Sequence, residues 1–257
     1  MDWIYPISGF IVGVTVGLTG VGGGSLMTPL LILVFGFSPS TAIGTDLLYA
    51  AITKSAGTIA HRARANIEWR IVGLLSAGSV PAATVTLIVL HTLVRDTKVV
   101  STLLSATLGF ALLATSAALL FRNRVLTYAD TAARGSSMSG TAGSRVVLLG
   151  LVLGVLVTLS SVGAGALGTV ALLMLFPRMP AVRIVGTDIA HAVPLTLVAG
   201  LGHAALGHVN YILLASLLIG SVPGVWLGSV AASRFSERIL RALLAMLLLA
   251  LGVRLML

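Results

Sequence analysis

Hydrophobic residues fill eight long stretches of this chain, and polar residues are largely confined to the short segments between them. The stretches cover approximately residues 7–36, 42–61, 67–91, 99–121, 145–176, 182–205, 209–231 and 239–257. Most are close to the ~20 residues that a helix needs to cross a bilayer. Long uninterrupted apolar runs are also unlike the short alternating strands of a membrane β-barrel. The pattern therefore predicts an all-α polytopic membrane protein.

Two of these stretches, 7–36 and 145–176, are too long for one simple crossing, and both carry glycine near their middle. The first contains the cluster at residues 20–24, and the second contains Gly163-Ala164-Gly165. A glycine costs about 1 kcal/mol relative to alanine inside a helix, so each cluster is predicted to break its helix. Other glycines recur at every fourth position and fit close helix packing instead: Gly9, Gly13 and Gly17, and Gly220, Gly224 and Gly228.

The second half of the chain repeats the first. At an offset of 141 residues the glycine-broken stretches match, and after one inserted residue Gly44-Thr45-Asp46 recurs as Gly186-Thr187-Asp188. We therefore predict a first repeat at 1–121, a polar linker at 122–144 and a second repeat at 145–257. Internal repeats of this kind are typical of secondary transporters.

The basic residues predict how the two repeats are oriented. If both long stretches cross once, the flanking Lys and Arg divide seven to eight between the two sides, which is no bias. If each stretch turns back at its glycines, only Arg95, Lys98 and Arg254 lie opposite a group of twelve: Arg62, Arg64, Arg70, Arg122, Arg124, Arg134, Arg145, Arg178, Arg183, Arg234, Arg238 and Arg241. Basic residues concentrate on the cytoplasmic side. The charge pattern thus favours two inverted repeats, each a re-entrant segment followed by three transmembrane helices, with a cytoplasmic linker and both termini outside.

Composition agrees with a membrane protein. Charged residues make up 9% of the chain and hydrophobic residues 57%, so a soluble fold would lack a polar surface. The net charge of +9 lies mainly between apolar runs, which favours a role in topology over nucleic-acid binding. The absence of cysteine excludes disulfides and thiolate metal sites.

Residues 1–6 lack a basic region, so the start is expected to be a membrane segment and not a cleaved signal.

Four ionisable residues fall inside apolar stretches, namely Asp46, Lys54, Asp188 and His191. Each costs roughly 3 kcal/mol at membrane depth, which makes all four candidates for function. Asp46 and Asp188 could carry a coupling proton, or they could cap the helices that begin near them. A lysine such as Lys54 inside an apolar stretch is expected either to bind an anion or to pair with a buried acidic residue. His191 could be a substrate or proton ligand, or a polar contact in the core.

The predicted helix breaks suggest an anion site. A helix that restarts inside the membrane presents free N–H groups and the positive end of its dipole. The residues expected to bind substrate there are Gly22, Gly23, Gly24 and Ser25 in the first half and Gly163, Ala164 and Gly165 in the second, with the hydroxyls of Thr45 and Thr187. Close packing of small residues is the competing explanation for these glycines.

We find no motif for nucleotide, metal or covalent catalysis. Residues 163–168 match G-x-G-x-x-G, but they lie inside an apolar run with no preceding strand and no acidic residue at the required spacing. P-loop, zinc-protease and nucleophile-elbow motifs are also missing from the sequence. The sequence therefore predicts a protein that is not an enzyme, with no cofactor and no metal. Its expected partners are a small anion and the lipid bilayer, and homo-oligomerisation is left open.

The segment at 17–31, GLTGVGGGSLMTPLL, followed by AIGTDLL at 42–48, resembles the sulfite exporter TauE/SafE family. The counterparts around 186–188 and 220–223 fit the same pattern. The resemblance implies a bacterial inner-membrane transporter that exports sulfite, sulfonates or other organosulfur anions. Family members commonly carry an aspartate in the loop after the second helix of each repeat, where this chain has Asn66 and Asn210.

The function expected from the sequence is therefore secondary transport of a small anion by alternating access around a midplane site. An anion channel and a non-transporting accessory subunit of the membrane are the alternatives.

Overall fold

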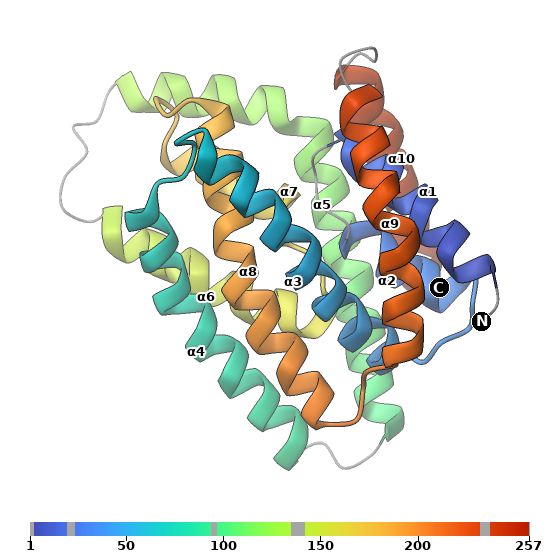
Figure 1. Cartoon of the computed structure of the whole chain (residues 1–257). Coiled ribbons are helices and arrows are strands. Elements are labelled where there is room, and N and C mark those ends of the chain that lie inside the picture. Colours follow the sequence, from blue (N-terminus) through green and yellow to red (C-terminus); the bar gives the residue numbers. More distant parts are fainter. Residues whose placement is uncertain (1–2, 20–23, 94–96, 135–141, 232–236, 257) are drawn as a thin grey trace.

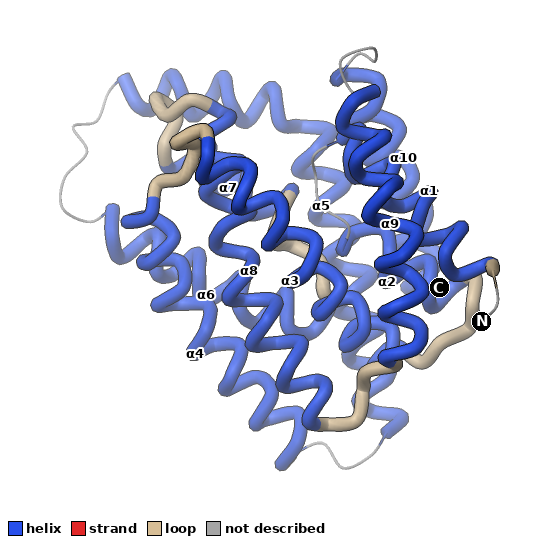
Figure 2. The backbone as a smooth tube through the Cα atoms, viewed as in Figure 1, coloured by secondary structure: helices blue, strands red, loops and turns tan. Residues whose placement is uncertain are grey.

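The computed structural model describes residues 3–19, 24–93, 97–134, 142–231 and 237–256, and every regular element within these ranges is an α-helix (Figures 1 and 2). The helices are α1 (Ile4–Thr19), α2 (Gly24–Leu33), α3 (Pro39–Ala63), α4 (Trp69–Leu93), α5 (Thr97–Arg134), α6 (Ala142–Ser160), α7 (Ala166–Leu175), α8 (Ala181–Ala205), α9 (Tyr211–Ala231) and α10 (Glu237–Met256).

Six segments of these helices are long and apolar enough to cross a membrane. They are Trp69–Thr92, Lys98–Arg122, Gly143–Ser160, Ala181–Ala205, Tyr211–Ala231 and Ile239–Met256. Ile4–Leu18 and Ala166–Leu175 are shorter apolar helices. The prediction of an all-α polytopic membrane protein is therefore confirmed. Helix α3 is not among the six, and it contains two of the buried ionisable residues described below, Asp46 and Lys54.

Each long apolar stretch contains two helices, which lie on either side of its glycine cluster. Helix α1 ends at Thr19 and α2 begins at Gly24, while Gly22 and Gly23 lie outside the described residues. Helix α6 ends at Ser160 and α7 begins at Ala166. Between α6 and α7, Gly163 and Gly165 have φ angles of +125° and +141°, which side chains rarely permit. The second cluster thus uses glycine for its backbone freedom, as its sequence predicted.

Apolar contacts involve the outer ends of the helices that flank each glycine cluster. Tyr5, at the start of α1, packs edge-on against Phe35 just after α2, with ring centroids 5.2 Å apart. In the second half, Val146 near the start of α6 belongs to the same hydrophobic cluster as Leu172 and Leu173 near the end of α7.

Glycines bring α1 against α9 at very short range. A Cβ at Gly13 would lie 2.6 Å from the Ser221 carbonyl oxygen, and one at Gly224 would lie 2.4 Å from that of Phe10. The equivalent pair of the repeat, α6 against α4, packs in the same way: a Cβ at Gly150 would lie 2.2 Å from the Leu75 carbonyl oxygen. The every-fourth glycines therefore serve helix packing, as predicted.

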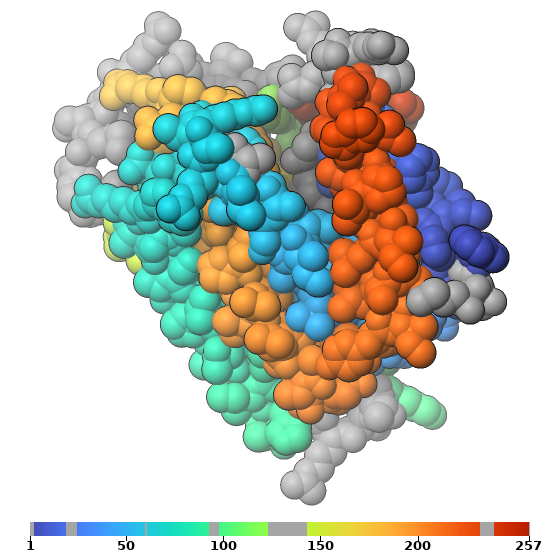
Figure 3. Space-filling view, in the orientation of Figure 1, coloured from blue at the N-terminus to red at the C-terminus, as the bar shows by residue number. Residues whose placement is uncertain are grey.

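Helices α3 and α8 occupy equivalent positions in the repeat and pack against each other in opposite directions (Figure 1). The Thr45 hydroxyl near the start of α3 accepts a hydrogen bond from the Asn210 N–H just beyond α8, at 3.1 Å. The Thr187 hydroxyl near the start of α8 accepts one from the Glu68 N–H just beyond α3, at 3.0 Å. In the space-filling view, α4, α8, α3 and α9 make up most of the near face (Figure 3).

The polar segment after residue 121 is helical in its first part. Helix α5 continues to Arg134, and its last turns bend away from the rest of the helix (Figure 1). Residues 122–134 contain no glycine or proline, so the sequence has no residue there that ends a helix. The polarity of this segment predicts that it lies outside the membrane, and it does not predict whether the segment is helical. Residues 135–141, within the predicted linker, lie outside the described part of the chain.

We expect Gly220→Ala to destabilise the protein. The new Cβ would lie 1.8 Å from the Pro6 carbonyl oxygen, so α1 and α9 would have to separate, at a cost of about 2 kcal/mol or more. Gly73→Ala in α4 is the control, because a Cβ at this position would meet nothing within 4 Å beyond the backbone of its own helix. Thermal unfolding of detergent-solubilised protein should show a lower Tm for the first variant only; equal Tm values would contradict this packing.

Candidate functional site

The four ionisable residues singled out in the sequence are all buried in α3 or α8. Exposed fractions are 0% for Asp46, 7% for Lys54, 1% for Asp188 and 0% for His191. Helix α3 begins at Pro39 after the N-cap Ser38, whose hydroxyl accepts from the Thr41 N–H. Both aspartates thus lie two turns inside their helices, and the alternative that they cap those helices is wrong.

The two carboxylates instead bind the short helices that follow the breaks. Asp46 Oδ2 accepts a hydrogen bond from the Thr28 hydroxyl of α2 and another, 2.9 Å long, from Ser161. Asp188 Oδ2 accepts one from the Thr169 hydroxyl of α7, also at 2.9 Å. Because Thr28 and Thr169 are equivalent in the repeat, the two halves hold their carboxylates by the same device.

Asp188 lies at the beginning of α7. Gly165 is the N-cap of α7, and its backbone N–H interacts with the Asp188 carboxylate. A Cβ at Gly168 would lie 2.2 Å from Asp188 Oδ1, so only glycine lets the carboxylate approach this turn. The N-terminus of a helix carries partial positive charge, which stabilises a carboxylate placed there.

Lys54 connects the two carboxylates to the break in the second half. Its ammonium donates a hydrogen bond to the Ala164 carbonyl oxygen, and it interacts electrostatically with both Asp46 and Asp188. The equivalent position in the second half is Thr196, so only the first half supplies a buried cation here. Ala164 thus enters the site through its carbonyl group.

His191 makes a polar contact with α4. Its Nε2 lies 2.9 Å from the Ser79 hydroxyl, which is itself fully buried. The other ring nitrogen, Nδ1, has no hydrogen-bond partner among the residues that the structure describes. The core contact is therefore present, and one buried nitrogen is left over for a ligand.

Further buried polar atoms in the described ranges also have no hydrogen-bond partner. They include Asp46 Oδ1, Asp188 Oδ1 and Ser221 Oγ. Buried polar groups are nearly always satisfied, so a cluster of unpartnered ones is a place where a ligand, a proton or water belongs. Within those ranges no group of three or more His, Cys, Asp or Glu side chains is arranged to hold a metal ion.

The remaining predicted substrate ligands fall into two groups. Gly24 begins α2 and Ser25 is buried beside it, in the first turn of that helix. Thr45 and Thr187 lie away from the breaks: their hydroxyls join the two halves, and that of Thr187 also donates to the Arg183 carbonyl at 2.6 Å. In this conformation both threonines link α3 and α8 to the loops of the opposite half.

A histidine pair lies at the end of α8, with His203 in its last turn and His208 in the loop that follows. His203 Nε2 is 3.0 Å from the Thr158 carbonyl oxygen, which can only accept, so this nitrogen carries a proton. In neutral His203 the other nitrogen then accepts from His208 Nδ1, 3.2 Å away. Burial lowers the pKa of His208, so this loop histidine stays neutral at physiological pH.

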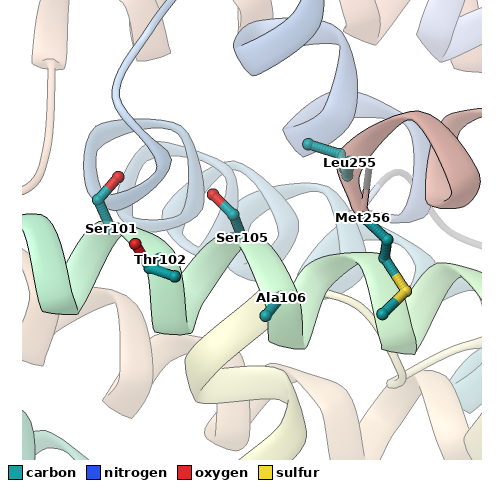
Figure 4. Close-up of a pocket in the computed structure, with 6 residues that line it drawn as sticks. All are labelled: Ser101, Thr102, Ser105, Ala106, Leu255 and Met256. Carbon is teal, nitrogen blue, oxygen red and sulfur yellow. The ribbon is translucent and has the colours of Figure 1, made fainter.

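A separate cavity of about 310 Å³ lies between α5 and α10 (Figure 4). It is lined by three hydroxyl side chains of one helix face and by the C-terminal residues of α10: Ser101, Thr102, Ser105, Ala106, Leu255 and Met256. None of these side chains is ionisable. We therefore locate the candidate site at the helix breaks and not in this cavity.

Sequence reasoning missed the side chains that hold the four ionisable residues. These are Thr28, Ser161, Thr169 and Ser79. The repeat already contained a signal for two of them, because Thr28 recurs as Thr169 among the matched positions. Ser79 also recurs, as Ser221, but nothing in the sequence joins it to His191, which lies more than a hundred positions away. Ser161, with a left-handed φ of 58°, is not among the matched positions, and it too bonds a residue more than a hundred positions away.

Taken together, the fold and this cluster define a polytopic helical membrane protein with interrupted helices around a buried polar centre. The family model for the sulfite exporter TauE/SafE family matches residues 5–255, and the chain belongs to that family.

The curated relatives carry transporter names. The chain is 39% identical over 253 residues to "Probable membrane transporter protein YjnA" of Bacillus subtilis, covering 97% of both chains. It is 27% identical over 237 residues to YdhB of the same organism, also named a probable membrane transporter protein, covering 91% of both chains. A protein of Xylella fastidiosa with that description is 26% identical over 255 residues, covering 96% of this chain and 91% of its own. No solved structure matches the chain.

We expect Lys54→Met to destabilise the fold by about 3–5 kcal/mol, because it leaves two buried carboxylates without their cation. Adding Asp188→Asn should restore part of the loss by removing one of those charges. The control is Arg62→Met, which removes an exposed cation from the same helix. Thermal unfolding in detergent measures all three; a Lys54→Met protein as stable as wild type would contradict the charge pairing.

Proposed function

We propose that this protein is a secondary transporter of small anions in the bacterial inner membrane, working by alternating access. The observation that carries the proposal is the buried polar cluster, in which α3 and α8 bring ionisable side chains to the ends of interrupted helices. Family membership and the names of the relatives support membrane transport. The family description names sulfite and export, which supports sulfite as a substrate and export as the direction. We extend the proposal to sulfonates and related organosulfur anions, which the family resemblance in the sequence implies.

The membrane arrangement that we propose consists of two inverted repeats. Equivalent helices α3 and α8 pack antiparallel, and the bonds Thr45–Asn210 and Thr187–Glu68 match across the repeat, as an axis in the membrane plane requires. The apolar contacts at the outer ends of the α1–α2 and α6–α7 segments support re-entrant hairpins. With the basic residues inside, the 122–144 linker is cytoplasmic and both termini lie outside.

The anion site that we propose lies at the two helix breaks. N–H groups at the start of α7 would donate to the anion, and the Lys54 ammonium would complement its charge. Ser25 and residues 22–24 would supply the corresponding donors from the first half. His191 Nδ1 and the unpartnered oxygens of Asp46 and Asp188 border this region, and the aspartates are candidates to carry a coupling proton. Thr45 and Thr187 could contact substrate only in a state that releases their bonds between the halves.

Transport of this kind has to be driven by ion or substrate gradients, because the chain carries no nucleotide motif. An anion channel is the nearest alternative, and it would give flux that neither saturates nor exchanges. An accessory subunit would give no flux when purified. Neither alternative explains why charged groups from both halves are buried at helix breaks.

Single cysteines test the inverted arrangement directly, because the chain has none of its own. Trp69 and Tyr211 are equivalent in the repeat and both are exposed, at the first residues of α4 and α9. We expect a membrane-impermeant maleimide to label Trp69→Cys only from the cytoplasmic side and Tyr211→Cys only from the outside. Labelling of both from one side would overturn the inversion.

Purified protein in liposomes tests transport and the site together. We expect saturable uptake of at least one anion among sulfite, sulfate, thiosulfate, sulfoacetate and taurine, accelerated by the same anion on the opposite side. Lys54→Gln should lower uptake by roughly tenfold or more, since a hydrogen bond to a charged group contributes about 1.5–3 kcal/mol. Gly165→Leu should do the same, because it strains the break at φ +141°.

The control for this measurement is Arg62→Gln, which changes an exposed charge of α3 far from the breaks. Rates are compared on monodisperse protein so that unfolded material does not count as loss of transport. Uptake that survives both site variants would refute the site, and flux that neither saturates nor exchanges would favour the channel.

A further inference from the structure

We infer that the Asp188 carboxylate occupies the anion site at the start of α7 in this conformation, and that the substrate anion replaces it only when Asp188 takes up a proton. The inference rests on the proposed function and specifies how the same site is regulated. A monovalent anion and one proton would then cross the membrane in the same direction, so export by this route would be driven by the outward gradient of the substrate.

The first step is the identity of the donors. The Gly165 N–H and the Thr169 hydroxyl are groups that an oxyanion would use at the start of α7, and both are directed at Asp188. A sulfonate or sulfite oxygen is an anionic acceptor of the same kind as a carboxylate oxygen. The side chain therefore takes the place that the substrate needs.

The second step is an independent feature of the same carboxylate. Asp188 is 1% exposed, its Oδ1 has no hydrogen-bond partner in the described ranges, and this oxygen faces the first turn of α7 at Gly168. An unpartnered carboxylate oxygen is a natural position for a proton. Once protonated, the group is neutral and becomes a donor, which would bind an incoming anion where the ionised form would repel it.

The third step is the charge of the buried cluster. The charged group that interacts with Asp188 is Lys54 of α3, which also interacts with Asp46. His191 of the same helix as Asp188 bonds Ser79 of α4, and α7 contributes no ionisable side chain. With both aspartates ionised and Lys54 charged, the sum is −1. A monovalent anion would make it −2, and one proton restores −1. Buried charge is costly unless it is paired, so anion and proton are expected to enter together.

The hydrogen bonds of the two aspartates favour Asp188 over Asp46 as the proton carrier. Asp46 Oδ2 accepts two hydroxyls, one from each half, and so ties Thr28 to Ser161. Asp188 accepts one hydroxyl and lies at the N-cap of α7. Neutralising Asp188 therefore frees a helix start, whereas neutralising Asp46 loosens a link between the halves.

The test measures binding of methanesulfonate, whose charge is constant from about pH 5 to about pH 8, by wild type, Asp188→Asn and Asp46→Asn. Wild-type affinity should rise as pH falls, by up to about tenfold per pH unit for one proton. Asp188→Asn, which mimics the protonated form, should bind at every pH with no such slope. Glu68→Gln is the matched control: it removes a partly exposed carboxylate from the loop before α4 and should keep the slope.

A second measurement does not depend on a variant. Methanesulfonate added to wild-type protein in weakly buffered solution should cause uptake of about one proton per anion bound. Binding without a pH slope, no proton uptake, or a slope lost in Asp46→Asn and kept in Asp188→Asn would each overturn the inference and leave the transporter function standing. If wild type neither binds nor transports methanesulfonate or any anion of the panel above, the proposed function itself fails.

Discussion

A helix that breaks inside a hydrocarbon layer leaves backbone N–H and C=O groups that water cannot reach, so the protein must satisfy them itself. In this chain, ionisable side chains lie at the groups that the break between α6 and α7 leaves. Lys54 binds the carbonyl of Ala164, and Asp188 lies at the N-terminus of α7. Burying a charged side chain costs free energy, and so does leaving a backbone group without a hydrogen-bond partner. When the two bind each other, both costs are reduced. The polar centre and the helix breaks are thus one structural feature.

The same constraint makes each half of the chain incomplete without the other. Ser161 of the second half bonds Asp46 of the first, while Lys54 of the first half bonds Ala164 of the second. Farther out, α3 and α8 each bond the loop that follows the other. A site whose groups come from both halves changes shape whenever the halves move relative to one another, and alternating access requires this coupling.

The repeat allowed much of this centre to be predicted from sequence. The glycine cluster at 163–165 predicted the second break, and the polar residues of two otherwise apolar stretches predicted the buried ionisable centre. The recurrence of Thr28 as Thr169 was present in the sequence, but it did not reveal that both hydroxyls bind the aspartates. Partners such as Ser161 and the Ala164 carbonyl could not be found, because a contact across more than a hundred residues leaves no local pattern. The capping interpretation of Asp46 was wrong because Ser38 and Pro39 already start α3 one turn before the Gly-Thr-Asp segment. The local sequence pattern was sufficient to predict where the helices lie, but it was not sufficient to predict which helices contact one another.

The two halves are not chemically equivalent, and the difference bears on how such a protein would work. Lys54 corresponds to Thr196, so the only buried lysine of the centre lies beside the second break. At the periphery, Glu68 pairs with Arg183 at 3.1 Å, whereas the equivalent positions Asn210 and Thr41 cannot form an ion pair. Exchanging the conformations of two identical halves would give two states of equal energy. Unequal halves give states of unequal energy, and the one with the lower energy sets the side of the membrane from which an empty carrier is loaded.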